Sequence, residues 1–234
     1  MENQSFMDPN YVPEEYKVPY DIIELPSQGL LYPNKKSKVK VEFLTAYDEN
    51  ILTSPNIMAS GKLIDVLIER KVKDLGFDHN LLLEGDRMAI IIFLRVSAFG
   101  EKYIQPVVDP KTNKLVEGEI DLSKLENKQL TIQADENGNF DFKLPKSGKN
   151  IKFRLLTGKD EEEIDILDVE LMERNKSDIS SKTTIRLERS IMEVDGEKDK
   201  IRISNTLKAL PILDIRKLNK YMTEIEPGII FKTT

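Results

Sequence analysis

The chain of 234 residues contains no cysteine, no tryptophan and one histidine. Without cysteine there are no disulfides, no thiolate nucleophile and no cysteine-ligated zinc or iron–sulfur cluster. With His79 alone, a multi-histidine metal site is impossible and a Ser-His-Asp triad would depend on that residue. Glycine-rich phosphate loops and the G-x-S-x-G and H-E-x-x-H motifs are also missing. We therefore expect no catalytic residue, metal or cofactor, and the only catalytic option left is a pair of carboxylates.

Charge and hydropathy narrow the classes of partner. The chain has 35 basic and 41 acidic residues, a formal net charge of −6 and a pI of about 5.2, which argues against nucleic-acid binding. The longest apolar run, Met88 to Leu94, is far shorter than the roughly 20 residues of a membrane-spanning helix. Residues 1–5 have neither a basic nor an apolar stretch, so we expect no secretory signal. Protein partners are the favoured class.

Proline content and apolar spacing divide the chain into four expected segments. Residues 1–19 resemble an extended arm, and residues 20–100 a β-hairpin plus a helical cluster. Short strands separated by turn residues predict a β-rich subdomain over 101–155, and helical spacing returns over 156–234. The expected fold class is α+β.

Local signals place several elements in the first half. Alternating apolar residues predict strands over 21–25 and 38–43. Thr45, three residues before Asp48, is typical of a helix start. The apolar segment 83–95 predicts a helix in the middle of the core.

In the second half, the acidic run 160–163 fits the first turn of a helix, where it complements the helix dipole. Leu187, Ile191 and Val194 fit one stripe of a further helix. A third helix is expected behind Asp199, and a last one after Pro211.

Three charged residues near the apolar helix are expected to be structural: Asp86, Arg87 and Arg95. Asp86 stands at a helix start, where capping explains an acid. Arg95 is expected to pair with a buried acid, either Asp86 or Asp65, rather than to bind a ligand.

Three segments are candidates for binding a partner: the aromatic arm, the loop after the first strand, and the C-terminal end, which could add as a strand to a partner's sheet. The candidate residues are Phe6, Tyr11, Tyr16, Leu30, Leu31, Tyr32, Ile229, Ile230 and Phe231. Two alternatives stay open: the arm is disordered with incidental aromatics, and Leu30 and Leu31 turn back onto the chain's own core.

The order of several blocks resembles a known family. Residues 25–33, Leu-Pro-Ser-Gln-Gly-Leu-Leu-Tyr-Pro, are similar to an LPS-x-G-x-x-Y opening. Residues 44–52, 82–100 and 120–122 follow in the same order, and the C-terminal blocks are 195–196, 213–216 and 227–228. Together these blocks, over residues 20–228, resemble the baseplate hub and hub-assembly proteins of contractile-tailed bacteriophages.

This resemblance implies a non-catalytic structural or assembly protein of the tail baseplate hub. Its partners would be other baseplate and tail proteins, or further copies of the chain, without nucleic acid or membrane. It would act in the host cytoplasm during assembly and then in the virion tail. Two alternatives stay open: a tail-assembly chaperone absent from the mature virion, and a carboxylate-based cell-wall hydrolase of the hub.

Overall fold

The computed structural model describes residues 17–108, 112–176 and 178–230, and the expected α+β class is confirmed. The α-helices are α1 Ala46–Leu52, α2 Pro55–Ala59, α3 Leu63–Lys71, α4 Glu84–Phe99, α5 Gly158–Asn175, α6 Lys182–Ser190, α7 Lys200–Lys208 and α8 Ile212–Ile225. The 3-10 turns are η3 His79–Leu81 and η4 Leu122–Lys124. The strands are β1 Tyr20–Glu24, β2 Lys38–Glu42, β3 Lys102–Val108, β4 Leu115–Asp121, β5 Glu126–Lys128, β6 Asn139–Lys143, β7 Asn150–Arg154, β8 Ile191–Val194 and β9 Gly228–Ile230.

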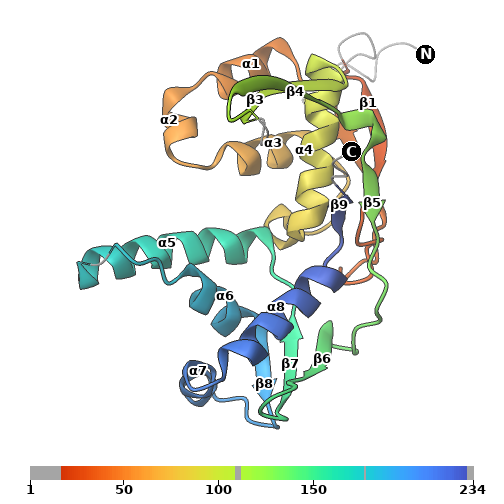
Figure 1. Ribbon diagram of the computed structural model, residues 1–234. Helices are drawn as coiled ribbons and strands as arrows, with labels where there is room; N and C mark the ends of the chain where they lie inside the picture. Colours follow the sequence, from red (N-terminus) through yellow and green to blue (C-terminus); the bar gives the residue numbers. More distant parts are fainter. Residues whose placement is uncertain (1–16, 109–111, 177, 231–234) are drawn as a thin grey trace.

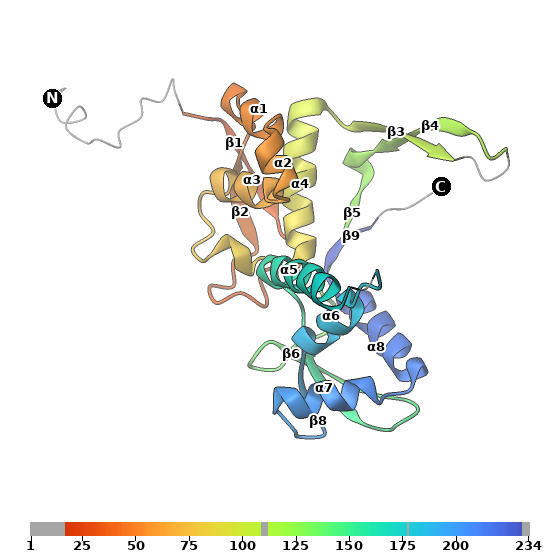
Figure 2. The same cartoon turned by 90° about the vertical axis from the view of Figure 1, so that its left-hand side faces the viewer.

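Two groups of elements lie at opposite ends of the molecule (Figure 1). In one, the β1–β2 hairpin and helices α1 to α3 surround α4. In the other, the antiparallel sheet β6-β7-β8 lies beside α6, α7 and α8. Helix α5 runs between the two groups and extends away from both (Figures 1 and 2).

The N-terminal group forms as its sequence predicts. Val39 and Val41 alternate with polar residues along β2, and both side chains are fully buried. Thr45 precedes α1 and forms a capping box with Asp48. Pro55 occupies the first turn of α2, where its missing N–H costs no hydrogen bond.

Helix α4 is central, but it is not buried on all sides. Ile90 and Leu94 are buried in the main hydrophobic cluster, whereas Met88 and Phe99 are exposed. The expected helix is therefore present, but it lies in the middle of the core on one side only; Gly100, with a φ of 82°, ends it. In the described parts of the chain, no helix has the length and apolarity needed to cross a bilayer.

The two groups join at the start of α4. The N–H of Gly158 donates to the carbonyl of Leu82 at 2.9 Å, and Leu83 forms a β-bridge with Thr157. Gly85 lies against the backbone of Pro227: a Cβ at position 85 would lie 1.9 Å from the Pro227 carbonyl oxygen. One hydrophobic cluster runs from Leu25 in the first group to Leu218 and Ile225 in the second. The two groups therefore share a core.

The strands between residues 101 and 155 belong to three separate sheets. β3 pairs with β4, β5 pairs with the distant β9, and β6 and β7 form a sheet with β8. The expectation that Leu187, Ile191 and Val194 share a helix is wrong, because α6 ends at Ser190 and Ile191 begins β8. The cause is tertiary: the segment completes the sheet on β7, where Ile191 and Val194 are buried.

Candidate functional site

The β3–β4 hairpin extends away from the end of α4 (Figure 2). Among the described strands, β3 and β4 pair only with each other. Arg95 fixes the root of the hairpin by donating from Nη1 to the carbonyl of Gly100, at 3.2 Å, and from Nη2 to that of Lys102, at 3.4 Å. The same guanidinium stacks over the rings of Phe99 and Tyr103. Arg95 is therefore structural, but its expected pairing with Asp86 or Asp65 is wrong.

Both faces of this hairpin carry exposed apolar side chains. The register places Val107 opposite Val116 on one face, and Val108 opposite Leu115 on the other. Tyr103 lies on the first face and Ile104 on the second. These six side chains are all exposed, and Leu115 is the most exposed of them at 72%.

A two-stranded hairpin is only marginally stable when nothing packs on it. Exposed contiguous apolar residues of this kind mark surfaces that bind other proteins. The sequence does carry a signal for this surface, because apolar residues stand at the neighbouring positions 103–104, 107–108 and 115–116. Neighbouring strand residues point to opposite faces, so such pairs indicate a strand that is apolar on both sides.

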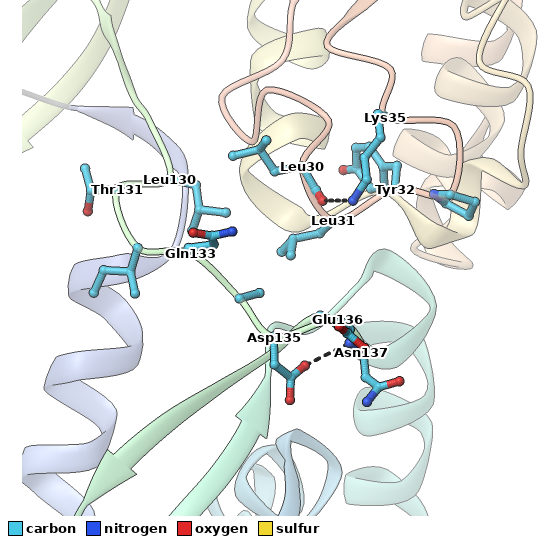
Figure 3. A pocket seen from close by; sticks show the side chains of 14 residues that line it. Leu30, Leu31, Tyr32, Lys35, Leu130, Thr131, Gln133, Asp135, Glu136 and Asn137 are labelled. Atoms are coloured by element: carbon cyan, nitrogen blue, oxygen red, sulfur yellow. Dashed lines mark hydrogen bonds between the residues drawn. The ribbon is translucent and has the colours of Figure 1, made fainter.

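The loop after β1 forms a second apolar surface, and its two leucines differ in how far they are exposed. Leu30 is 46% exposed, and Leu31 is half-buried against the core. Both line a cavity of about 740 Å³ between this loop and residues 130–138, shown in Figure 3. In that view Leu30 and Leu31 lie across the cavity from Leu130 and Gln133.

Tyr32 lies in the core instead of on a surface. Its side chain is 3% exposed, and its hydroxyl donates to the carboxylate of Asp86 and accepts from the N–H of Leu83 at 2.9 Å. Ser27 donates to the same carboxylate through its N–H at 2.9 Å and its hydroxyl at 2.5 Å. The prediction of Tyr32 as a partner-binding residue is therefore wrong, because its hydroxyl is part of a buried network.

Asp86 is a buried acid that forms no ion pair with the residues the structure describes. Burial raises its pKa, although the hydrogen bonds from Ser27 and Tyr32 act in the opposite direction. Since Ser27, Tyr32 and Asp86 belong to the blocks of the family resemblance, this network shows that part of that pattern maintains the fold.

Arg87 is a buried cation at the junction of the two groups. It donates to Asp65 at 2.5 Å and lies 3.6 Å from a carboxylate oxygen of Glu84. Its guanidinium covers Gly158 so closely that a Cβ there would lie 2.3 Å from Nη1. Arg87 therefore links α4 to α3 and to the start of α5, and its structural role stays a prediction.

The C-terminal strand is already paired within the chain. Ile229 and Ile230 belong to β9, which pairs with Asn127 and Glu126 of β5. One edge of this segment is therefore occupied, and its addition to a partner's sheet through the other edge stays a prediction. Four further candidates lie outside the described residues: Phe6, Tyr11, Tyr16 and Phe231.

Carboxylates gather in a cleft of about 530 Å³ where α5 and α8 meet the start of α4. Glu161 and Glu226 line it, and burial raises the pKa of both. Arg186 donates to Glu161, whose Oε1 is buried and has no hydrogen-bond partner in the described structure. No group of three or more potential ligands is arranged to hold a metal in the residues described.

The exposed β3–β4 hairpin and the loop at Leu30 are thus the candidate protein-binding surfaces. No protein-family model, no curated protein and no solved structure matches this chain.

Proposed function

We propose that the chain is a non-catalytic structural and assembly protein of the baseplate hub of a contractile-tailed bacteriophage. The observation that carries a protein-binding role is the β3–β4 hairpin, which is rooted on α4 and exposes apolar side chains on both faces. The resemblance of the ordered sequence blocks to baseplate hub proteins supports the baseplate hub as the assembly in which the chain works. Its partners are other baseplate and tail proteins, or further copies of the chain, first in the host cytoplasm and then in the virion.

The hairpin suits this role because a neighbouring subunit can cover both of its faces. Burying a valine, leucine or isoleucine side chain completely contributes about 1.5–3 kcal/mol. Six exposed apolar side chains therefore represent enough energy to offset much of the cost of association.

The test is a double substitution on one face of the hairpin, Ile104→Ser with Leu115→Ser. The matched control removes two equally exposed residues from α7 and α8, Ile201→Ser with Ile212→Ser. Each variant complements a phage that lacks the gene, and infectious particles are counted.

We expect the hairpin variant to weaken association about 100-fold, since about 1.4 kcal/mol corresponds to a factor of ten. Particle yield should fall at least about tenfold, and far-UV circular dichroism should show an unchanged fold. Normal yield from the hairpin variant, or an equal loss from the control, would contradict the proposal.

A second candidate function is a carboxylate-based hydrolase of cell-wall material, favoured by Glu161 and Glu226 in the cleft. A raised pKa suits a carboxyl group that acts as a general acid. The test is the release of soluble fragments from purified peptidoglycan by the chain and by Glu226→Gln. No release by the unmodified chain removes this candidate.

A further inference from the structure

Helix α5 leaves one face uncovered along its second half. Ile164 is buried between α5 and α6, and Leu171 packs on the same small cluster. The opposite side carries Ile166, Val169, Glu170 and Glu173, whose spacing of three, four and seven residues places them on one stripe. We call these four residues the distal face of α5. Ile166 is 52% exposed and Val169 is 55% exposed.

In the described structure, α6 packs on the side of α5 that carries Ile164 and Leu171, opposite the distal face. Figure 1 shows α5 extending past α6, and Figure 2 looks along it from its C-terminal end. The distal face therefore has two apolar side chains in water next to two carboxylates.

The net negative charge of the molecule is equal to that of α5 alone. The helix contains eight acidic and two basic residues, a net charge of −6, and −6 is also the formal net charge of the whole chain. The rest of the sequence is balanced, so α5 is the distinctly acidic element.

The acids in the first two-thirds of α5 all have partners within the fold. The pairs are Asp160 with Arg154, Glu161 with Arg186, Glu162 with Lys62, Glu163 with Arg189, Asp165 with Lys182, and Asp168 with the hydroxyl of Ser180. In contrast, Glu170 and Glu173 form no ion pair with the residues that the structure describes. Their charges are available to a partner.

We propose that the distal face of α5 binds a basic amphipathic helix of a partner protein. The apolar pair Ile166 and Val169 would pack against the apolar stripe of that helix. Lysine or arginine beside the stripe would pair with Glu170 and Glu173, whereas an acidic helix would be repelled. The inference does not depend on the assembly in which the chain works.

A second copy of the chain is a poorer occupant. Helix α7 has three cations and no acid, and all three cations are already engaged: Lys200 with the carbonyl of Ile191, Arg202 with Glu197 and Lys208 with Glu188. A partner with free cations fits the charge of α5 better.

The size of the surface sets the expected strength. The ten residues from 166 to 175 span about 15 Å, which gives less contact than a standard interface of about 800 Å² on each partner. We therefore expect weak, micromolar binding that salt reduces because the charged groups are exposed.

The test uses the full chain and a fluorescent synthetic 14-residue helix with leucine on one stripe and lysine beside it. A second peptide has glutamate in place of every lysine. Binding is followed by fluorescence anisotropy at low and high salt. The variants are Glu170→Lys with Glu173→Lys, and Ile166→Ser with Val169→Ser. The matched control, Glu49→Lys with Glu69→Lys, makes the same charge change at exposed helical acids elsewhere.

We expect the lysine peptide to bind at least about tenfold more tightly than the glutamate peptide, and more weakly at high salt. Both α5 variants should lose at least about tenfold in affinity while the control loses little. The proposal is overturned if the lysine peptide does not bind, or if the control loses as much as the charge variant. Self-association of the chain that disappears in Glu170→Lys with Glu173→Lys would also overturn it, because the occupant would then be a second copy.

Discussion

Substituting Tyr32 by phenylalanine separates a core role from a binding role for this residue. The variant keeps the ring and its contact with Phe77, whose ring centroid is 4.6 Å away. It removes only the hydroxyl, which donates to Asp86 and accepts from the N–H of Leu83. If Tyr32 were a surface anchor, the variant would fold normally and lose binding.

The magnitude follows from the two lost hydrogen bonds. Leaving the buried N–H of Leu83 without a partner costs about 1–3 kcal/mol, and losing a hydrogen bond to a charged group costs about 1.5–3 kcal/mol. We therefore expect the free energy of unfolding to fall by about 3–5 kcal/mol. For a chain of this length, that corresponds to a fall in Tm of about 10 °C.

The assay is urea unfolding followed by far-UV circular dichroism. The matched control is Tyr47→Phe, because Tyr47 is exposed and its ring lies against Arg70 without depending on the hydroxyl. We expect less than about 0.5 kcal/mol for the control. Equal unfolding midpoints for the two variants would refute the assignment of Tyr32 to a buried network.

Two further predictions concern the fold. Asp48 is buried and forms ion pairs with the buried Lys71 and the partly exposed Arg70. Burial alone would raise its pKa, but hydrogen bonds from Lys71 and Thr45 outweigh burial and lower the pKa to about 2. This carboxylate therefore stabilises the fold above its unfolded pKa of 3.8, and about 2 kcal/mol of stability is lost as the pH falls from about 5 through 2. Asp48→Asn should lower the free energy of unfolding by about 3–5 kcal/mol at pH 7. Between about pH 5 and 2, the free energy of unfolding of this variant should change less with pH than that of the unmodified chain. An equal change with pH would contradict this. Gly85→Ala should destabilise by about 3 kcal/mol or more, because its Cβ would meet the Pro227 backbone, and hydrogen exchange should show β9 released from β5. The control is Gly61→Ala, because Gly61 has open space around it but a φ of 70°, and this variant should cost only about 1 kcal/mol. Equal losses of stability in Gly85→Ala and Gly61→Ala would contradict the close approach of Gly85 to the Pro227 backbone.

The parts of the fold that depend on neighbours in sequence could be predicted. Thr45 and Asp48 define the start of α1 within one turn, and Asp199 caps α7 by accepting from the N–H of Arg202. Gly100 ends α4 through its own backbone conformation. Such signals need no knowledge of the rest of the molecule.

The parts that depend on distant pairing could not be predicted. The segment from Ile191 to Val194 fits a helical stripe by spacing, but the edge of β7 makes it a strand. β5 and β9 are about one hundred residues apart, and no local pattern shows that they pair. The periodicity of a short apolar run does not by itself distinguish a helix from a strand.

The candidate binding residues could likewise be predicted only in part. Leu30 and Tyr32 look equally suited to an interface in the sequence, yet one is exposed and the other buried. The difference lies in Asp86, 54 residues further along, which binds the tyrosine hydroxyl. The hairpin surface was visible as neighbouring apolar residues in β3 and β4, but its isolation from other strands is a property of the fold.

The central claim is that this chain is a structural part of a phage baseplate, and quantitative mass spectrometry of purified, intact particles tests it most directly. The account predicts that the chain is present in a small fixed copy number that matches the rotational symmetry of the hub. A chain that is abundant in infected cells but missing from the particles would contradict the claim and favour an assembly chaperone.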